Sequence, residues 1–190
     1  MRGTLVIFLK EPQPGRVKTR LGAEIGMTRA AWWFRHQAHS LIRRVGRDPR
    51  WRTVLAVSPN VQGISSRVWP PDLPRWPQGN GDLGDRMARA LKAMAPGPAM
   101  VIGADIPAID RHHIAPAFAT LRRNDAVLGP ARDGGYWLIG LKHPRAAPAN
   151  MFEGVRWSTE HAMADTVQSL DSLKIGYAAT LSDVDTAADL

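Results

Sequence analysis

Short apolar runs alternate with longer amphipathic segments along most of the chain. The apolar runs are typical of buried strands and lie at residues 4–9, 53–57, 99–103, 126–128 and 136–141, with a last one within 175–181. The amphipathic segments predict helices at residues 28–45, 82–95, 111–123 and 159–173. This alternation predicts an α/β fold in which a doubly wound, mostly parallel sheet lies between two layers of helices, a three-layer αβα arrangement.

Two segments interrupt the pattern. Residues 10–21 contain Pro12, Pro14 and Gly15, which predict a loop after the first strand. Residues 58–77 contain several prolines, so we expect mostly irregular structure there, with a short extended piece at residues 67–69. Neither segment has the composition of a linker between domains, and the length of 190 residues suits one core. We therefore interpret residues 1–190 as a single domain.

The charge and cysteine content narrow the choice of partners. The formal net charge is +8, but the cations are scattered and no basic stripe is interleaved with aromatic residues, so we expect no nucleic-acid partner. No apolar run is long enough for a membrane span, and we expect no membrane partner. The absence of cysteine excludes disulfides and thiolate metal ligands and fits a cytoplasmic protein. A small phosphorylated substrate would account for the functional part of the positive charge.

The tryptophans suggest two further features. An apolar surface patch around Trp32, Trp33, Trp51 and Trp69 could support a homodimer. Trp157 is either a core residue or the wall of a pocket for an acceptor substrate, and the sequence leaves both interpretations open.

Carboxylates follow one of the predicted strands and stand near the end of the chain. Asp105 comes two residues after the apolar run at residues 99–103 and two residues before Pro107, so its side chain is expected beyond the end of a buried strand. Ligands of open α/β sheets bind at that edge. Asp183 and Asp185 can lie on one side of an extended segment. Because Mg²⁺ usually takes one or two carboxylates together with substrate phosphates, Asp105 with one of these two residues predicts a metal site.

A cationic loop follows the first predicted strand. It combines the glycine turn at Gly15 with Lys18 and Arg20, and such a loop can bind phosphates through backbone N–H groups and positive charge. Val17 stands where the Walker A motif requires a glycine directly before the lysine, which excludes a P-loop NTPase. Since the loop follows a parallel strand and opens toward the same edge as Asp105, we interpret it as a phosphate-binding loop.

Six short motifs in order carry a resemblance to a known family. They are FLKEPQPGRVKTRL at residues 8–21, QGNGDLG at 78–84, GADIP at 103–107, GPARDGGY at 129–136, WST at 157–159 and DVDT at 183–186. Together they resemble a bacterial family of small, poorly characterised transferases with the GT-A (nucleotide-diphospho-sugar transferase) fold, often labelled glycosyltransferases. The family is similar in turn to 2-phospho-lactate guanylyltransferase and, more distantly, to molybdenum-cofactor nucleotidyltransferases.

The resemblance implies roles for individual residues. It implies that Asp105 and Asp185 bind Mg²⁺ or Mn²⁺ and that Lys18, Arg20 and Asp105 are catalytic. An NTP or nucleotide sugar would be bound by Lys10, Gly15, Lys18, Arg20, Gln78, Gly79 and Asp82, with Gln78 and Gly79 near the base. The acceptor side would consist of Asp133, Gly134, Gly135, Tyr136 and Trp157.

Two reactions are compatible with these residues. In nucleotidyl transfer an acceptor attacks the α-phosphorus of an NTP, and the departing pyrophosphate needs cations such as Lys18 and Arg20. Glycosyl transfer from a nucleotide sugar needs such a loop less and usually employs two close acidic residues at the central metal site. We favour nucleotidyl transfer to a small anionic acceptor, which Arg132 and Arg156 could bind. Glycosyl transfer is the alternative, and a non-catalytic nucleotide- or phosphate-binding protein is the second alternative.

Overall fold

A computed structural model describes residues 2–190. Along the chain the strands and helices are β1 (Gly3–Lys10), α1 (Thr19–Ile25), α2 (Met27–Val45), β2 (Trp51–Ser58), α3 (Asn60–Ser65), β3 (Arg75–Pro77), α4 (Leu83–Ala93), β4 (Ala99–Ile102), α5 (Arg111–Thr120), β5 (Ala126–Pro130), β6 (Tyr136–Leu141), α6 (Ala162–Ser169) and β7 (Ile175–Tyr177). Short 3₁₀ turns lie at Pro144–Ala146 and Ala187–Asp189. Within residues 2–190 no helix combines the length and apolar character that crossing a membrane requires.

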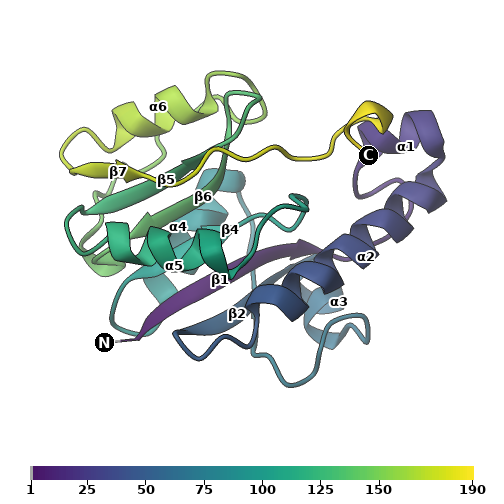
Figure 1. Cartoon of the computed structure of the whole chain (residues 1–190), viewed down its shortest axis with the longest axis horizontal. Coiled ribbons are helices and arrows are strands. Elements are labelled where there is room, and N and C mark those ends of the chain that lie inside the picture. The colour runs from purple at the N-terminus through teal and green to yellow at the C-terminus, as the bar shows by residue number, and fades with distance from the viewer. Residues whose placement is uncertain (1) are drawn as a thin grey trace.

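The strands form one sheet in the order β3-β2-β1-β4-β6-β5-β7 (Figure 1). Strands β1, β2, β3 and β4 are parallel to one another, and β7 is parallel to β5. Only β6 is antiparallel to both of its neighbours in the described chain. The prediction of a mostly parallel α/β sheet is therefore confirmed.

Helices cover both faces of the sheet, as side-chain alternation along β1 shows. Leu5 and Ile7 pack in one core cluster with residues of α2 and α5, whereas Val6 packs in a second cluster with residues of α4 and α6. The sheet is thus the middle layer of three (Figure 1). The C-terminal segment leaves β7 and crosses the molecule toward α1, where the chain ends beside an N-terminal helix.

The proline-rich segment is more regular than expected. Pro59 precedes α3, where a missing N–H costs nothing, and Pro77 lies in the edge strand β3, where it interrupts no central ladder. Residues 67–69, the expected extended piece, form no strand. Instead, the Arg75 guanidinium donates a hydrogen bond of 2.8 Å to the Trp69 carbonyl oxygen and so holds this segment.

Other differences concern element ends. α2 begins at Met27, one residue before the predicted start, and directly follows Gly26, whose φ of 96° breaks the helix. α1 begins at Thr19, inside the segment expected to be a loop. The predicted helices at 111–123 and 159–173 are longer than α5 and α6.

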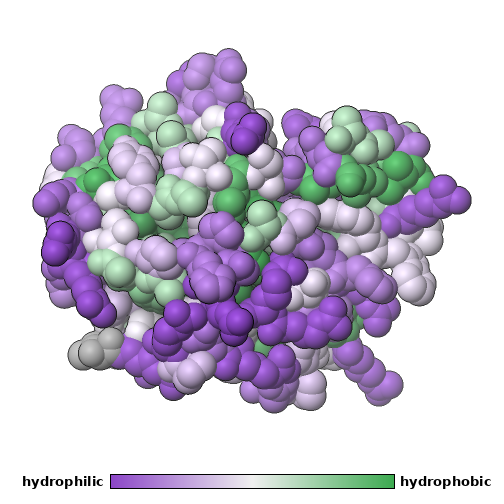
Figure 2. Space-filling model, viewed as in Figure 1, coloured by the Kyte–Doolittle hydropathy of each residue, from purple (hydrophilic) through white to green (hydrophobic). Residues whose placement is uncertain are grey.

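The expected patch of four tryptophans does not exist on the surface. Trp51 and Trp69 are each only 1 % exposed, and the Trp51 indole donates to the Val45 carbonyl oxygen at 2.9 Å. Trp32 is 60 % exposed and Trp33 half-buried. On the face drawn in Figure 2, apolar side chains are visible both over α1 and in the region of β5 and β7. The basis for the predicted homodimer is therefore reduced to Trp32 and its surroundings.

Gln78 joins the carboxyl ends of two central strands. Its side-chain amide donates to the carbonyl oxygens of Leu9 (3.1 Å) and Ala56 (2.9 Å), and the residue is buried. Replacement by Met preserves length but removes both hydrogen bonds. We expect Gln78→Met to lower the free energy of unfolding by about 1–3 kcal/mol in urea denaturation. Gln62→Met, at an exposed position of α3, is the matched control, and equal stability of the two variants would contradict this role.

Candidate functional site

Asp105 lies just beyond the carboxyl end of β4. Its neighbours Ala104 and Ile106 are buried in the core cluster that faces α2 and α5, whereas Asp105 is partly exposed. The two apolar neighbours anchor the backbone and direct the carboxylate away from the core. The sequence-based placement of this residue at the sheet edge is thus what the structure shows.

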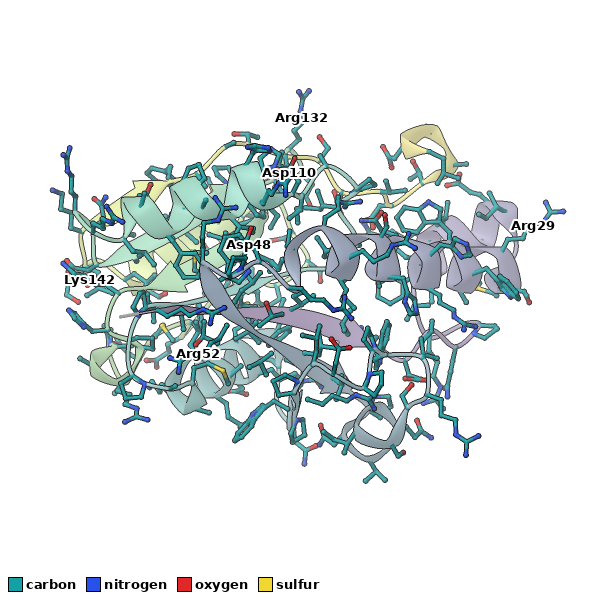
Figure 3. All side chains as sticks on the ribbon, turned by 60° about the horizontal axis from the view of Figure 1, so that its bottom comes forward. Arg29, Asp48, Arg52, Asp110, Arg132 and Lys142 are labelled. Carbon is teal, nitrogen blue, oxygen red and sulfur yellow. The ribbon has the colours of Figure 1, made fainter. Side chains whose placement is uncertain are left out.

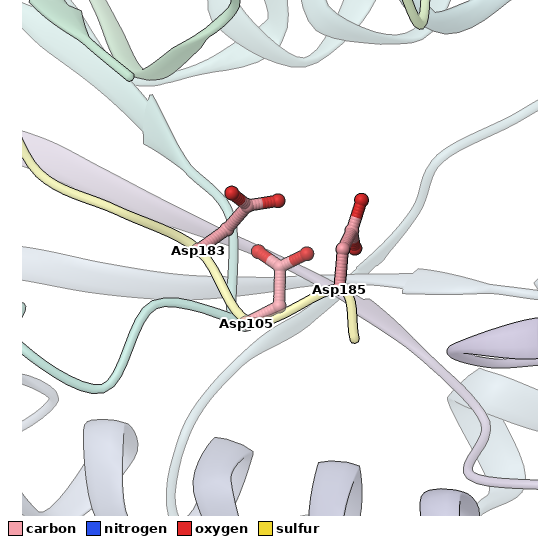
Figure 4. Close-up of side chains that lie close together, drawn as sticks. All are labelled: Asp105, Asp183 and Asp185. Carbon is pink, nitrogen blue, oxygen red and sulfur yellow. The ribbon is translucent and has the colours of Figure 1, made fainter. Parts of the chain in front are cut away.

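The C-terminal segment brings two more carboxylates to Asp105 (Figure 4). Val184 is buried in a small cluster with Leu21 and Ala30, so Asp183 and Asp185 on either side of it point the other way. Each of the three aspartates offers a carboxylate oxygen, and these oxygens all lie within 4.8 Å of one another. We call Asp105, Asp183 and Asp185 the acidic triad.

The acidic triad fits a divalent metal ion. Mg²⁺ prefers oxygen ligands at about 2.1 Å in an octahedron, in which opposite oxygens are about 4.2 Å apart. The spacing within the triad is therefore close to that of a coordination shell. The sequence left open whether Asp183 or Asp185 joins Asp105 as a metal ligand. In the structure, carboxylate oxygens of both residues lie within 4.8 Å of an oxygen of Asp105.

The cationic loop meets the triad directly. The Lys18 ammonium lies 2.8 Å from Asp105 Oδ2 and donates to Asp185 Oδ1 at 2.7 Å. Buried Val17 anchors the loop, and Lys18 itself has a left-handed backbone with a φ of 46° directly before α1. Residues from the two ends of the chain and from its middle therefore form one ionic cluster.

The two loop cations differ in exposure. The Lys18 side chain is only 8 % exposed, so the surrounding protein shields its ammonium from solvent. The Arg20 side chain is 72 % exposed, with one guanidinium nitrogen 3.3 Å from Asp185 Oδ2. Arg20 can therefore reach a ligand with its remaining donors, whereas Lys18 directs two of its three N–H donors to Asp105 and Asp185 and keeps one for a ligand.

Charges inside the cluster shift its pKa values. Burial by itself lowers the pKa of the Lys18 ammonium, but Asp105 and Asp185 outweigh burial and raise this pKa above its ordinary value. Burial and the charges of Asp185 and Asp105 raise the pKa of the Asp183 carboxyl. Negative charge is thus in excess around Asp183. A further cation beside it would reduce the repulsion between the carboxylates.

The loop at residues 78–82 lies at the same end of the sheet but is built differently from the expectation. The Gln78 amide nitrogen is used within the fold, and Asp82 caps α4 by accepting from the Asp85 N–H at 2.9 Å. Gly79 has a φ of 82°, and its N–H donates to Asn60 Oδ1 at 2.9 Å. Arg89 donates to the backbone carbonyls on both sides of Gly79. No local motif marks Asn60 or Arg89 as supports of this loop.

The expected acceptor segment forms a turn against the start of α6. Asp133 accepts from the Gly135 N–H at 2.9 Å, and its charge acts on Asp183, which places it near the triad. A Cβ at Gly134, where φ is 86°, would collide with the Glu160 backbone. The turn therefore requires glycine at position 134.

Two aromatic residues stand beside this turn. The Tyr136 hydroxyl lies 3.3 Å from Thr166 Oγ1 of α6, and burial raises the pKa of Tyr136 above its usual value. Trp157 is half-buried and packs edge-on against Phe152 and Tyr136. Its indole nitrogen is buried and has no hydrogen-bond partner among residues 2–190. Trp157 is thus part of the packing and also holds an unused donor.

The two arginines expected to bind an anionic acceptor have different surroundings. Arg156 is paired with Asp165 through two hydrogen bonds of 2.8 and 2.9 Å, which occupy the Nε–Nη2 edge of its guanidinium. Arg132 is exposed and projects away from the body of the molecule (Figure 3). Asp165 thus competes with an acceptor for Arg156, whereas Arg132 and exposed Lys10 at the end of β1 have no carboxylate partner among residues 2–190.

Comparison with solved structures agrees with this architecture. A Desulfovibrio desulfuricans G20 protein, assigned provisionally as a nucleotide-diphospho-sugar transferase, has a TM-score of 0.88 at 28 % identity, covering 98 % of this chain and 84 % of that one. The 4-diphosphocytidyl-2C-methyl-D-erythritol synthase of Anaerococcus prevotii DSM 20548 has a TM-score of 0.64 at 13 % identity, covering 99 % and 94 %. A Mycobacterium tuberculosis H37Rv protein in complex with manganese has a TM-score of 0.57 at 14 % identity, covering 100 % and 95 %.

Sheet order, layers and these likenesses define a protein with the nucleotide-diphospho-sugar transferase fold. The chain belongs to the family described as "Uncharacterized protein conserved in bacteria (DUF2064)", whose model matches residues 41–159. None of the curated proteins matches the chain in sequence. The family and fold expected from the six motifs are thereby confirmed.

The geometry of the triad predicts metal binding that depends on Asp105 and Asp185. We expect Mn²⁺ to bind the purified protein, measured by electron paramagnetic resonance of free Mn²⁺. Asp105→Asn and Asp185→Asn should each weaken binding by about tenfold or more, since loss of even an outer-shell partner commonly costs that much. Asp171→Asn, at an exposed position far along the chain from the triad, is the control. Unchanged Mn²⁺ affinity in both triad variants would rule the site out.

Proposed function

We propose that the protein is a metal-dependent nucleotidyltransferase that transfers a nucleoside monophosphate from an NTP to a small anionic acceptor. The observation that carries this proposal is the ionic cluster in which Lys18 lies 2.7–2.8 Å from Asp185 and Asp105. Cations that can neutralise polyphosphate and carboxylates that can hold a metal ion thus share one edge of the sheet. The manganese bound to a structure of the same fold and the synthase likeness add support.

The proposed donor site uses the loop after β1 and the acidic triad. Asp105 and Asp185 would hold Mg²⁺ or Mn²⁺, with Asp183 as a third ligand. When bound, the metal ion supplies Lewis-acid activation of the α-phosphorus and neutralises phosphate charge. The Gly15 turn, Lys18 and Arg20 would bind the β- and γ-phosphates.

The base and the sugar would lie along neighbouring segments of the same edge. Lys10 and the loop from Gln78 to Asp82 would contact the nucleoside, and the carbonyl oxygen of Gly79 would accept from a base, since the Gly79 N–H already bonds Asn60. The amide nitrogen of Gln78 would support that loop rather than read the base, since it bonds Leu9 and Ala56.

The proposed reaction is an in-line displacement. An oxygen of the acceptor forms a bond to the α-phosphorus, and the bond from that phosphorus to the α,β-bridging oxygen breaks. Pyrophosphate departs with the electron pair of the broken bond, and Lys18 and Arg20 stabilise its charge. Catalysis then comes from positioning and electrostatics and requires no protein nucleophile.

The acceptor would bind against the turn at Asp133–Gly135. The Trp157 indole N–H, which is buried without a partner among residues 2–190, would donate to it. Tyr136 would form the wall through its ring, because its hydroxyl faces Thr166. Exposed Arg132 would attract an anionic acceptor.

Glycosyl transfer from a nucleotide sugar is the second candidate. The observation that favours it is the 28 % identity over nearly the whole chain to the protein assigned provisionally as a nucleotide-diphospho-sugar transferase. In that reaction a nucleoside diphosphate departs from the sugar carbon, and the same triad and loop would hold its phosphates.

Arg20 offers a direct test of phosphate binding, because it is exposed and its removal should leave the fold intact. We expect Arg20→Gln to weaken triphosphate binding by about 10- to 150-fold, the loss of one charge-assisted contact of about 1.5–3 kcal/mol. Isothermal titration of each NTP with Mg²⁺ measures this loss. Arg29→Gln on α2, whose side chain projects into solvent (Figure 3), removes the same charge and should change nothing. Equal affinity of both variants would show that Arg20 has no part in binding.

The product identifies the reaction. With Mg²⁺, one NTP at a time and a protein-free extract of small molecules as acceptors, we expect pyrophosphate to form for at least one base. Asp105→Asn should abolish its formation, and Asp171→Asn should not. Release of a nucleoside diphosphate from a nucleotide sugar, with no pyrophosphate from any NTP, would instead establish the glycosyltransferase. NTP binding that needs no divalent metal and yields neither product would indicate a nucleotide-binding protein without catalysis.

A further inference from the structure

A cavity of about 360 Å³ lies at the opposite end of the sheet from the acidic triad. Thr4 at the start of β1 and Trp51 to Val54 at the start of β2 line it. Because strands rise about 3.3 Å per residue, Thr4 is about 20 Å from Lys10 at the carboxyl end of β1. The cavity is therefore separate from the site described above.

The cavity exists because β2 is longer than the strand beside it. β3 pairs only with Leu55–Val57, so the first half of β2 has no neighbour on that side. The Leu55 N–H donates to the Pro74 carbonyl oxygen on this outer side. Backbone groups two residues apart point the same way, so the Thr53 N–H also faces outward. Residues after α2 and α4, among them Gly46 and Met94, close the remaining sides.

The Thr53 hydroxyl is the unusual group in this cavity. Thr53 is 7 % exposed and lines the cavity, and its Oγ1 is buried without a hydrogen-bond partner among residues 2–190. Leaving a buried polar group unpaired is costly, so such groups in folded proteins usually have a partner. A polar atom of a ligand in the cavity would provide one.

The rim of the cavity is positively charged. Arg47 is paired with Asp72, and Asp48 is paired with Arg50. Arg2 and Arg52 also line the cavity and have no carboxylate partner in the described chain. Arg2 donates to the Trp51 carbonyl oxygen at 2.7 Å and Arg52 to the Arg2 carbonyl oxygen at 3.3 Å, so each guanidinium keeps further donors. Figure 3 labels Arg52 and Asp48 on this part of the molecule.

The rest of the wall is apolar. The apolar lining consists of Trp51, Val54, Leu73, Pro74 and Met94. An apolar wall with a few polar groups and a volume near the lower limit of about 300–1,000 Å³ is typical of small-molecule sites. The charge of the rim selects for an anion, and the wall selects for an apolar body.

We propose that this cavity binds a small organic anion, an apolar body carrying one carboxylate or phosphate group. Arg2 and Arg52 bind the anionic group, the Thr53 hydroxyl donates to or accepts from its polar atoms, and the apolar body packs on Trp51 and Met94. The site is independent of the nucleotidyltransferase proposal, and neither proposal requires the other.

Titration with benzoate tests the site, with benzyl alcohol as a neutral probe of the same shape. In ¹H–¹⁵N correlation spectra at constant ionic strength, we expect benzoate to produce saturable shifts of the Thr53 and Val54 amide resonances. Benzyl alcohol should bind about tenfold more weakly, because it lacks the charge that Arg2 and Arg52 recognise. Absence of saturable shifts with benzoate, or equal affinity for the two probes, would overturn the proposal.

Variants locate the binding in the cavity. Thr53→Val removes the unpaired hydroxyl, so it should weaken benzoate binding about fivefold without lowering the melting temperature. Arg52→Gln should weaken benzoate binding about tenfold, and Arg29→Gln should leave it unchanged. Ala95→Trp, at an exposed position on the cavity wall, should block binding without disturbing the core. Benzoate affinity equal to that of the unaltered protein in Arg52→Gln and Ala95→Trp would place the probe elsewhere and refute the site.

Discussion

The contact of the Lys18 ammonium with Asp105 and Asp185 holds the functional edge of this protein together. Lys18 precedes α1, Asp105 follows β4, and Asp185 belongs to the segment that ends the chain. Without a cation between them, the two carboxylates would repel each other across a short distance. The ammonium thus determines how closely the N-terminal loop, the central strand and the C-terminal segment can approach.

Apolar neighbours make this concentration of charge possible. Buried Ala104 and Ile106 flank Asp105, buried Val184 lies between Asp183 and Asp185, and buried Val17 precedes Lys18. These buried side chains anchor the backbone in the core. The charged groups therefore meet beyond the carboxyl end of β4 without disturbing the core. A second contact supports the same assembly, since Glu24 of α1 accepts from the Ala187 N–H at 2.9 Å. A rigid strand end and two anchored segments are a suitable frame for a metal ion and phosphates, which require fixed oxygen positions.

The two ends of the sheet have opposite electrostatic character. At the carboxyl ends, three carboxylates are in excess over the cations that contact them. At the amino ends, arginines without carboxylate partners in the described chain surround a mostly apolar cavity. The first environment suits a cation with polyphosphate and the second a small organic anion. A chain with a net charge of +8 can supply both because its cations are distributed rather than gathered in one stripe.

The sequence by itself determined the elements and the class of fold. Local periodicity identified the strand at residues 136–141 and the position of Asp105 beyond β4, because burial imposes a spacing that neighbouring residues reveal. The six motifs identified the family. Tertiary structure alone decided that β6 is antiparallel, that Trp51 and Trp69 are buried, and that the Gln78 amide serves the backbone. It alone joined Lys18 to Asp185 across 167 residues, because local patterns carry no information about which distant segments become neighbours.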